Sequence, residues 1–381
     1  MFIELHLIQN FAPANLNRDD TNNPKDCEFG GHRRARISSQ AFKRAIRKEP
    51  VFSETTEVKN AERSGRMTKP IVEKLVEAGK LEVDAKLVAN AMVAAYYSKK
   101  EKMDDKKPDR TLFLVYFAQS EIENLVKTTL EQWDEALKTA REGKPMAKFV
   151  KQLVDETKYR TSAPDIALFG RMLADKTELN VDAACQVAHA ISTHRVNMEM
   201  DFYTAVDELQ TAEEDEGAGA GMMGFTNFNS SCFYRYACID FGQLADNLRG
   251  DRDLARHTVE GFLRAAIDAI PTGKQNSFAA QNPTSLALAL VREDGKNWNL
   301  ANAFEEPVRA RRETGLIVPS IEALDSYWSD LTRRRDDAQF KAVAVWTDAA
   351  KHEQALSGLA GYHKPKLSEW VETIDSALPK E

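Results

Sequence analysis

A basic segment near the N-terminus contains the side chains of this sequence that are best suited to binding a ligand. Residues 33–48 hold seven Lys or Arg side chains and no Asp or Glu. Guanidinium and ammonium groups bind phosphate oxygens, and a basic face that no acid neutralises repels itself unless an anion contacts it. The segment therefore predicts a binding site for an anionic polymer such as a nucleic-acid backbone.

A short helix is expected to arrange these cations. Ser38 or Ser39 can cap its N-terminus and Pro50 ends it, which leaves about three turns from Gln40 to Glu49. Apolar residues share one face of this helix, namely Phe42, Ala45 and Ile46. The opposite face and the residues leading into the helix carry the candidate phosphate ligands, which are Arg34, Arg36, Ser38, Gln40, Lys43, Arg44 and Arg47.

Three carboxylates precede the basic segment and suggest a different chemistry. Asp19, Asp20 and Asp26 lie in an Asn-rich loop. Clustered carboxylates can hold Mg²⁺ for phosphodiester cleavage. Loops of this composition more often use such side chains in Asx turns. The pattern therefore favours a structural role and leaves a metal-dependent ribonuclease as the alternative.

Other signatures of catalysis or metal binding are weak. The sequence has no Walker loop, no G-x-S-x-G and no G-x-G-x-x-G. His189 and His194 are five positions apart, about 140° around a helix, so one helix face cannot present both to a metal ion. The favoured interpretation is that one or both histidines are packed and hydrogen-bonded near the end of a helix. The four cysteines include no C-x-x-C pair and are expected to be reduced thiols. We expect no metal and no cofactor.

The composition is that of a globular protein, with 43% hydrophobic and 29% charged residues in 381. The net charge of −7 argues against a protein that coats nucleic acid non-specifically. The longest apolar run, residues 112–118, is too short to span a bilayer, and the N-terminus lacks the pattern of a signal peptide. We expect a cytoplasmic protein without membrane contact.

The order of strand and helix patterns predicts an α+β protein with two insertions. Strand patterns at 3–7, 232–241, 286–292 and 341–346 are interleaved with helical patterns at 251–270 and 320–331. We expect one domain made from residues 1–60 and 231–381. Residues 61–192 are predicted to be a mostly helical insertion. Residues 193–230 are predicted to be a projecting arm, with two extended legs, an acidic run and a glycine-rich tip.

Short motifs along most of the chain resemble one known family and occur in that family's order. The first are NLNRDD at 15–20, KD at 25–26, FGG at 29–31, RRARISSQ at 33–40 and FKRA at 42–45. The later ones are DIALFGRM at 165–172, AHAISTH at 188–194, DFYTAVD at 201–207, FYRYA at 233–237, GKQ at 273–275 and ANAF at 301–304. The sequence is similar to the CasC backbone subunits (the Cas-seven family) of the type I-E CRISPR surveillance complex, Cascade.

The resemblance implies a hand-shaped fold. The palm would be a modified RRM-like (ferredoxin-like) sheet, the fingers the helical insertion and the thumb a β-hairpin. The implied contacts to the guide-RNA backbone are Arg18, Lys25, Ser38, Gln40, Lys43 and Arg47, and Lys274 in the GKQ motif is a further RNA contact. Met172 would be an apolar wedge from the fingers. The implied thumb residues are Phe202, Thr204 and Val206.

The resemblance also implies a non-catalytic function in antiviral defence. Several copies would stack head to tail along one CRISPR guide RNA (crRNA) and present it in segments for pairing with target DNA. Base pairing then supplies sequence specificity, so no catalytic residue is required of this chain. The expected partners are the guide RNA, target DNA through the guide, other copies of the chain, and the large, small, RNA-processing and guide-end-capping subunits of Cascade.

Two other functions remain to be weighed. A metal-dependent ribonuclease would cut target RNA through Asp19, Asp20 or Asp26. A generic RRM-like RNA chaperone is disfavoured, because the RNP aromatic signature is absent from the sequence.

Overall fold

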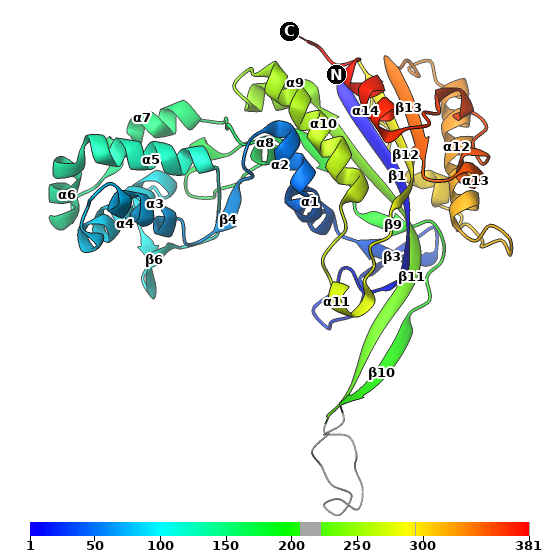
Figure 1. The fold of residues 1–381 in the computed structure, drawn as a ribbon, viewed down its shortest axis with the longest axis horizontal. Coiled ribbons are helices and arrows are strands. Elements are labelled where there is room, and N and C mark those ends of the chain that lie inside the picture. Colours follow the sequence, from blue (N-terminus) through cyan, green and yellow to red (C-terminus); the bar gives the residue numbers. More distant parts are fainter. Residues whose placement is uncertain (206–221, 294, 381) are drawn as a thin grey trace, which may run out of the picture.

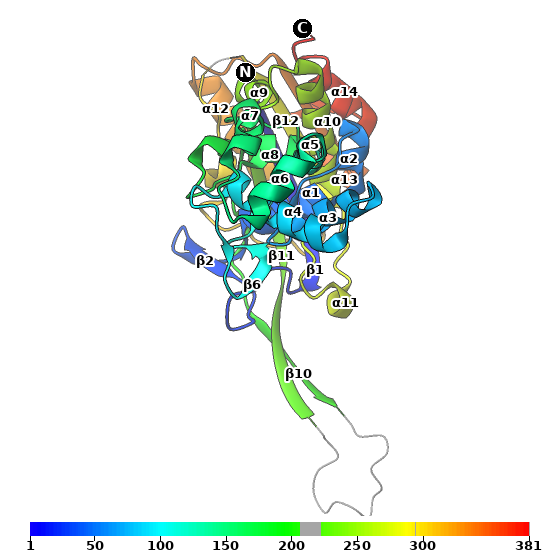
Figure 2. The ribbon, with the colours of Figure 1, turned by 90° about the vertical axis from the view of Figure 1, so that its left-hand side faces the viewer.

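The computed structural model describes residues 1–205, 222–293 and 295–380. These residues form a sheet domain, a helical lobe to one side of it and a two-stranded arm that extends away from it (Figure 1). The view turned by 90° shows the same arm standing clear of the other parts (Figure 2). Val206, one of the expected thumb residues, lies outside the described residues, as does the acidic run that follows it.

The sheet domain is built on one large antiparallel sheet. Its strand order is β13-β12-β1-β11-β9-β3-β2, and β8 and β10 also pair with β11. The strands are β1 (Phe2–Ala14), β2 (Asp26–Phe29), β3 (His32–Ile37), β8 (Cys185–Val187), β9 (Ala190–Ser192), β10 (Glu199–Ala205), β11 (Met222–Asp240), β12 (Thr284–Arg292) and β13 (Ala342–Thr347). β1 pairs with β11 on one side and with β12 on the other, so both chain ends contribute to one domain.

Helices cover both faces of this sheet. One face is covered by α1 (Ser39–Lys48), α2 (Pro50–Thr56), α9 (Phe241–Asn247), α10 (Arg252–Asp268) and α14 (Leu367–Asp375). The other face is covered by η2 (Leu300–Phe304) and α12 (Ile317–Arg334), and the short α13 (Ala350–Glu353) and η3 (Ala360–Tyr362) follow β13. Ile3, Leu5 and Leu7 pack against the first set of helices, and Ile8 packs on the α12 side. β1 is therefore buried on both faces, although its alternating sequence is typical of a half-buried strand.

A buried ion pair explains this difference. Glu4 Oε1 accepts a hydrogen bond from Arg292 Nε at 2.6 Å, and Glu4 Oε2 accepts one from the backbone N–H of Trp298 at 2.8 Å. Both charged side chains are fully buried, and burial raises the pKa of Glu4. The polar positions of β1 thus face internal partners under α12 and not solvent.

The helical lobe has a hydrophobic core of its own. Its elements are β4 (Glu62–Ser64), α3 (Thr68–Glu77), α4 (Glu82–Tyr97), β5 (Met103–Asp104), β6 (Lys107–Thr111), β7 (Val115–Phe117), α5 (Gln119–Glu131), α6 (Trp133–Arg141) and α7 (Ala147–Thr157). The chain returns to the sheet domain through α8 (Pro164–Phe169) and η1 (Thr177–Leu179). The lobe contacts the sheet domain near α1, as Figure 1 shows. None of the helices in the described part of the chain is long and apolar enough to cross a membrane.

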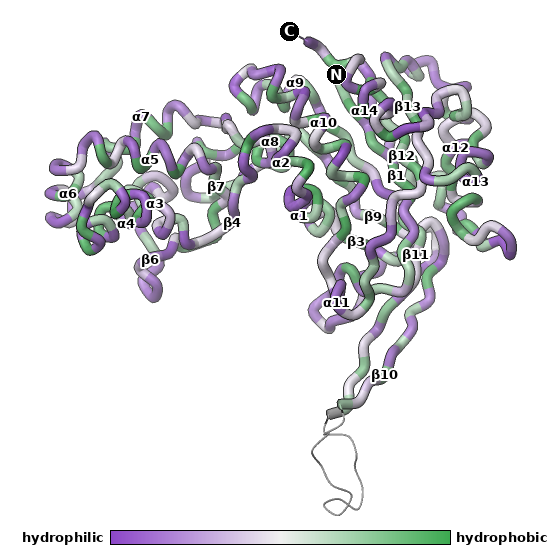
Figure 3. Tube along the Cα trace, in the orientation of Figure 1, coloured by the Kyte–Doolittle hydropathy of each residue, from purple (hydrophilic) through white to green (hydrophobic). Residues whose placement is uncertain are grey.

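The arm consists of β10 and the first half of β11. The two strands pair in regular antiparallel register from Glu199 opposite Phe228 to Ala205 opposite Met222. All seven residues of β10 are exposed. Hydrophobic and hydrophilic residues both occur along the arm (Figure 3). Within the described residues the arm is thus a pair of extended legs, as its composition predicts.

Candidate nucleic-acid interface

The basic helix α1 forms as its sequence predicts. The Ser38 hydroxyl caps the helix by accepting a hydrogen bond from the N–H of Ala41, and the Ser38 N–H donates to Asn17 Oδ1 at 2.8 Å. The helix ends at Lys48, before Pro50. Its buried face consists of Phe42, Ala45 and Ile46. The basic face therefore points away from the core of the sheet domain.

A cleft of about 790 Å³ lies along this basic face. α1 contributes Gln40, Lys43, Arg44, Arg47 and Lys48, and the facing wall consists of Ala61, Glu62, Arg63, Tyr116, Phe169 and Gly170. Glu62 is the one anion in a lining that holds five cations. Gln40 and Arg44 are exposed, and the Lys43 ammonium lies 5.7 Å from the centre of the Phe169 ring. The predicted phosphate ligands that α1 carries thus lie together on one cationic wall of the cleft.

Arg47 differs from the other cations of this face because it is held by Asp165. Its Nε donates to Asp165 Oδ2 at 3.0 Å, and its Nη2 donates to the carbonyl of Ala61 at 2.8 Å. The guanidinium also lies over the Tyr116 ring, 4.2 Å from its centre. Asp165 is fully buried and also accepts hydrogen bonds from the Tyr116 hydroxyl at 2.5 Å and from the N–H of Ala61. Burial and the neighbouring Asp165 carboxylate raise the pKa of Tyr116. Arg47 therefore joins α1 to the helical lobe.

Arg34 is a correction to the expected ligand set. Its side chain is fully buried. The guanidinium donates to four backbone carbonyls, those of Phe29, Ser192, Phe304 and Glu305. No face of this group is left for a phosphate, so Arg34 has a structural role and we remove it from the predicted RNA contacts.

Arg36 is half-buried beside the same hairpin. Its Nε donates to the carbonyl of Asp26 at 3.1 Å, and its Nη1 lies 2.9 Å from His189 Nδ1. The pKa of His189 is lowered by partial burial and by the nearby Arg36 and Lys25 cations. His194 donates from Nδ1 to the carbonyl of Arg195 and accepts at Nε2 from the N–H of Cys232. Both histidines make hydrogen bonds within the chain, as the favoured interpretation expects. Neither lies near the end of a helix, however, because His189 is exposed between β8 and β9 and His194 follows β9.

The loop before β2 places two more predicted ligands near the start of α1. Arg18 is exposed and donates to Asn22 Oδ1 at 2.7 Å. Lys25 is half-buried, and its N–H donates to the carbonyl of Asn17, whose side chain holds the N–H of Ser38. Lys274 lies on a neighbouring segment. A Cβ atom on Gly273 would come within 2.2 Å of the Leu16 carbonyl oxygen, so only glycine allows this close approach.

The same loop is attached to the base of the arm. Asn15 Nδ2 donates to the carbonyl of Asn227 at 2.8 Å, and Asn227 Nδ2 donates to Asn23 Oδ1 at 2.6 Å. The orientation of the arm is therefore coupled to the loop that carries Arg18 and Lys25. Phe202 and Thr204 are exposed on the described part of this arm.

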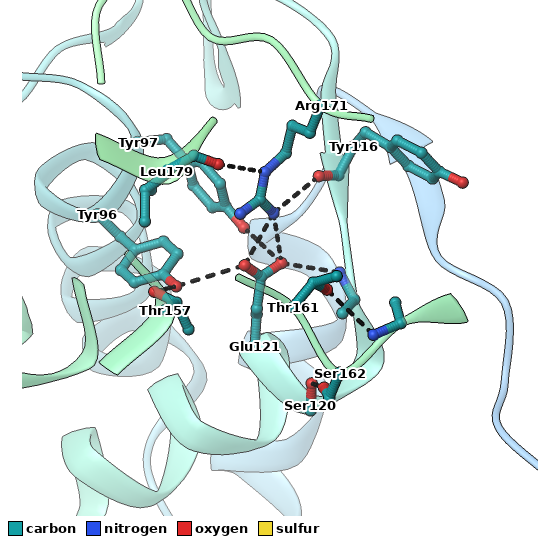
Figure 4. Close-up of polar contacts among 12 residues, drawn as sticks. Tyr96, Tyr97, Tyr116, Ser120, Glu121, Thr157, Thr161, Ser162, Arg171 and Leu179 are labelled. Atoms are coloured by element: carbon teal, nitrogen blue, oxygen red, sulfur yellow. Dashed lines mark hydrogen bonds and ion pairs between the residues drawn. The ribbon is translucent and has the colours of Figure 1, made fainter. Parts of the chain in front are cut away.

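Met172 is 87% exposed because its neighbour Arg171 is anchored in the lobe. Arg171 Nη1 donates to both Glu121 carboxylate oxygens, at 2.8 and 2.9 Å, and its Nε donates to the carbonyl of Leu179 (Figure 4). Tyr96 and Tyr97 also point toward Glu121 in Figure 4. Burial alone would lower the pKa of Arg171, but the charge and hydrogen bond of Glu121, together with the neighbouring Tyr97 and Tyr96, outweigh burial and raise this pKa. A buried ion pair thus fixes the backbone from which Met172 projects.

Two of the three carboxylates of the alternative hypothesis, Asp19 and Asp26, have partners within the protein. Asp19 Oδ1 accepts hydrogen bonds from the N–H of Asn23 and from the N–H and hydroxyl of Thr21, and these bonds lower its pKa. This is the Asx-turn role that the loop composition favours. Asp26 forms an ion pair with Arg33. Within residues 1–205, 222–293 and 295–380, no three His, Cys, Asp or Glu side chains are arranged to hold a metal ion.

A comparison with known protein families identifies the family of this chain. The family model for CT1975-like Cas proteins matches residues 3–373. The chain belongs to the CT1975-like family. This match confirms the resemblance to the Cas-seven backbone subunits that the motifs indicate. No curated protein sequence matches the chain.

Two solved structures are similar over the whole length. A chain of a "CRISPR RNA-guided surveillance complex, pre-nicking" is 31% identical with a TM-score of 0.85, and the alignment covers 99% of this chain and 100% of that one. A chain of a second "CRISPR RNA-guided surveillance complex" is 26% identical with a TM-score of 0.75, again over 99% of this chain and 100% of that one. The mixed α/β architecture with its large antiparallel sheet is therefore shared with these two solved chains.

Sequence reasoning did not identify Asp165, Arg63 or Tyr116 as parts of this region. A signal for Asp165 was present, because a lone carboxylate in the apolar segment PDIALF needs a buried partner. Arg63 and Tyr116 carried no such signal, since they reach the cleft only through the packing of the lobe on α1.

Asp165→Ala is expected to destabilise the protein strongly. The substitution leaves the Arg47 guanidinium and the Tyr116 hydroxyl without their acceptor, and removing one partner of a buried ion pair costs about 3–5 kcal/mol. Urea unfolding followed by tryptophan fluorescence measures this loss. Glu82→Ala removes a carboxylate from an exposed pair with Lys86 and is the matched control, for which we expect less than about 1 kcal/mol. Equal losses for the two variants would contradict the role assigned to Asp165.

Proposed function

We propose that this protein is a guide-RNA-binding backbone subunit of a CRISPR surveillance complex of the Cascade type. The observation that carries the proposal is the cationic surface of α1, where Lys43 and Arg44 face a cleft with a single anion. An elongated backbone of phosphates neutralises such a surface without sequence preference. The full-length similarity to chains of RNA-guided surveillance complexes supports the same ligand.

The sheet topology supports a palm of the ferredoxin-like type. The order β12-β1-β11 with β8 and β9 on the far side of β11, all antiparallel, has the fourth-first-third-second pattern of that fold. In this proposal the helical lobe is the fingers and the arm, expected at 193–230, is the thumb. The expected fingers segment, 61–192, extends too far, because β8 and β9 at its end belong to the large sheet. The second sheet face lies under η2 and α12. An RRM uses an open face for base stacking, so a generic RRM-like RNA chaperone is disfavoured.

The proposed ligand contacts form two groups, one in the cleft beside α1 and one at the loop before β2. Lys43, Arg44 and Gln40 line the cleft, and Arg18, Lys25, Arg36, Ser38 and Lys274 lie around the loop and the start of α1. Met172 and the arm residues Phe202 and Thr204 would touch bases. Several copies would stack head to tail along the guide and present it in segments to target DNA, together with the other subunits of the complex.

We propose no catalytic step for this chain. Guide pairing supplies specificity, and the protein is required only to hold the backbone and its shape. The ribonuclease alternative depends on loop carboxylates, and the hydrogen bonds of Asp19 and the ion pair of Asp26 favour a structural use of two of them.

Charge reversal on α1 tests the proposal. Lys43→Glu with Arg44→Glu should weaken binding to single-stranded RNA of every sequence alike and reduce the slope of log K against log salt by roughly 0.7 per lost contact. Fluorescence anisotropy at several salt concentrations measures the slope. Lys69→Glu with Lys86→Glu applies the same charge change to exposed residues of the helical lobe and should leave the slope close to that of the parent. Identical slopes for both double variants would overturn the proposal.

The ribonuclease alternative has its own test. We expect the parent protein and Asp26→Ala to leave labelled RNA and DNA intact in the presence of Mg²⁺, because no cleavage is proposed. Gel analysis of the labelled strands measures this. Cleavage by the parent that Asp26→Ala abolishes would favour the ribonuclease.

A further inference from the structure

The short turn between β8 and β9 places a histidine beside two of the proposed phosphate ligands. His189 is exposed, and its Nδ1 lies 2.9 Å from Arg36 Nη1 on β3. The backbone N–H of Arg36 donates to the Lys25 carbonyl at 2.9 Å, and the Lys25 charge also acts on the His189 imidazole. The three side chains therefore belong to one site, which we call the Lys25–Arg36–His189 cluster.

The hydrogen bond between Arg36 and His189 fixes the tautomer of the imidazole. A guanidinium can only donate hydrogen bonds, so His189 Nδ1 is the acceptor and the ring proton lies on Nε2. Partial burial and the charges of Arg36 and Lys25 lower the pKa of His189. The free protein thus holds an exposed, neutral imidazole beside two cations.

The other titratable groups on the elements around His189 do not offset these two cations. The Asp26 carboxylate, at the start of β2, forms an ion pair with Arg33. Burial raises the pKa of the Cys27 thiol on β2 and of the Tyr236 hydroxyl on β11, whose carbonyl pairs with the turn, so both groups stay neutral. A positive charge on His189 is therefore unfavourable in the free protein and needs an anion from outside.

We infer that guide-RNA binding takes up a proton at His189, so that the imidazolium joins Lys25 and Arg36 as a third cation for a backbone phosphate. The inference rests on the proposed function and concerns the regulation of the same site. A second proton, on Nδ1, displaces the hydrogen bond from Arg36, because both groups would then be donors. A phosphate oxygen accepts from both of them. The proton comes from the solvent, and no covalent bond of the RNA changes.

The direction of the pH effect follows from the charge of the ligand. A phosphate anion favours the protonated imidazole, so RNA raises the pKa of His189 above its value in the free protein. RNA affinity therefore increases as the pH falls through the pKa of the complex, and it becomes constant below the pKa of the free protein. Each unit between these two pKa values corresponds to about a tenfold change in affinity.

Fluorescence anisotropy of the full chain with labelled oligouridylate tests this inference, because uracil does not titrate near the pKa of histidine. The parent should bind roughly tenfold more tightly at about pH 5.5 than at about pH 8. The slope of log K against log salt should be steeper by up to about 0.7 at the lower pH, since one more cation contacts the strand.

Three substitutions separate the proton from the side chain. His189→Gln keeps an acceptor for Arg36 and should lose both pH effects. His189→Lys carries a permanent charge and should show the steeper salt slope already at the higher pH. His257→Gln is the matched control, because it removes an exposed histidine of α10 that does not line the cleft, and it should respond to pH like the parent.

The outcomes distinguish this inference from the proposed function. If His189→Gln responds to pH like the parent, the proton is taken up elsewhere and the inference is wrong. If His189→Gln lowers affinity equally at both pH values, His189 only positions Arg36 and the inference is again wrong. In both cases the proposed function stands as long as the Lys43 and Arg44 double variant loses RNA. A parent that binds no oligouridylate at either pH would contradict the proposed function and the inference together.

Discussion

One buried carboxylate, Asp165, holds the basic helix of this protein against its helical lobe. It accepts hydrogen bonds from Arg47 on α1, from the Tyr116 hydroxyl on β7 and from the backbone of Ala61. A buried ion pair is stabilising only where hydrogen bonds satisfy its remaining atoms, and here three segments supply the donors. The cleft therefore has a defined width, because both of its walls are attached to the same carboxylate.

The acidic net charge and the proposed RNA ligand are compatible because the cations are used in two ways. Arg34, Arg47, Arg171 and Arg292 are engaged with carbonyls or carboxylates inside the protein and connect its parts. Lys43 and Arg44 face the cleft, and Arg18 is exposed on the loop before β2. A groove needs only local positive charge to bind a phosphate backbone, so the net charge of −7 gives no information about the charge of that groove.

Local signals predicted the elements well, and long-range packing decided which residues remain available. α1 was predictable because Ser38, Pro50 and the apolar spacing lie within one short segment. The paired legs of the arm were predictable from composition. The different uses of Arg34 and Arg36, and of Arg44 and Arg47, could not be predicted, because the partners that decide these uses lie far along the chain. Arg47 and Asp165, for example, are 118 positions apart. The burial of the second face of β1 could not be predicted for the same reason, because the helix that covers this face, α12, comes from the other end of the sequence.

The central claim is that this chain binds a guide RNA as one of several copies, and the most direct measurement of it is the nucleic acid that co-purifies. The protein would be expressed with its genomic neighbours and a CRISPR array, and the bound RNA would be sequenced and its molar ratio to the chain determined. The account predicts discrete short RNA with repeat-derived ends and several copies of the chain per RNA. A monomer free of RNA would contradict it.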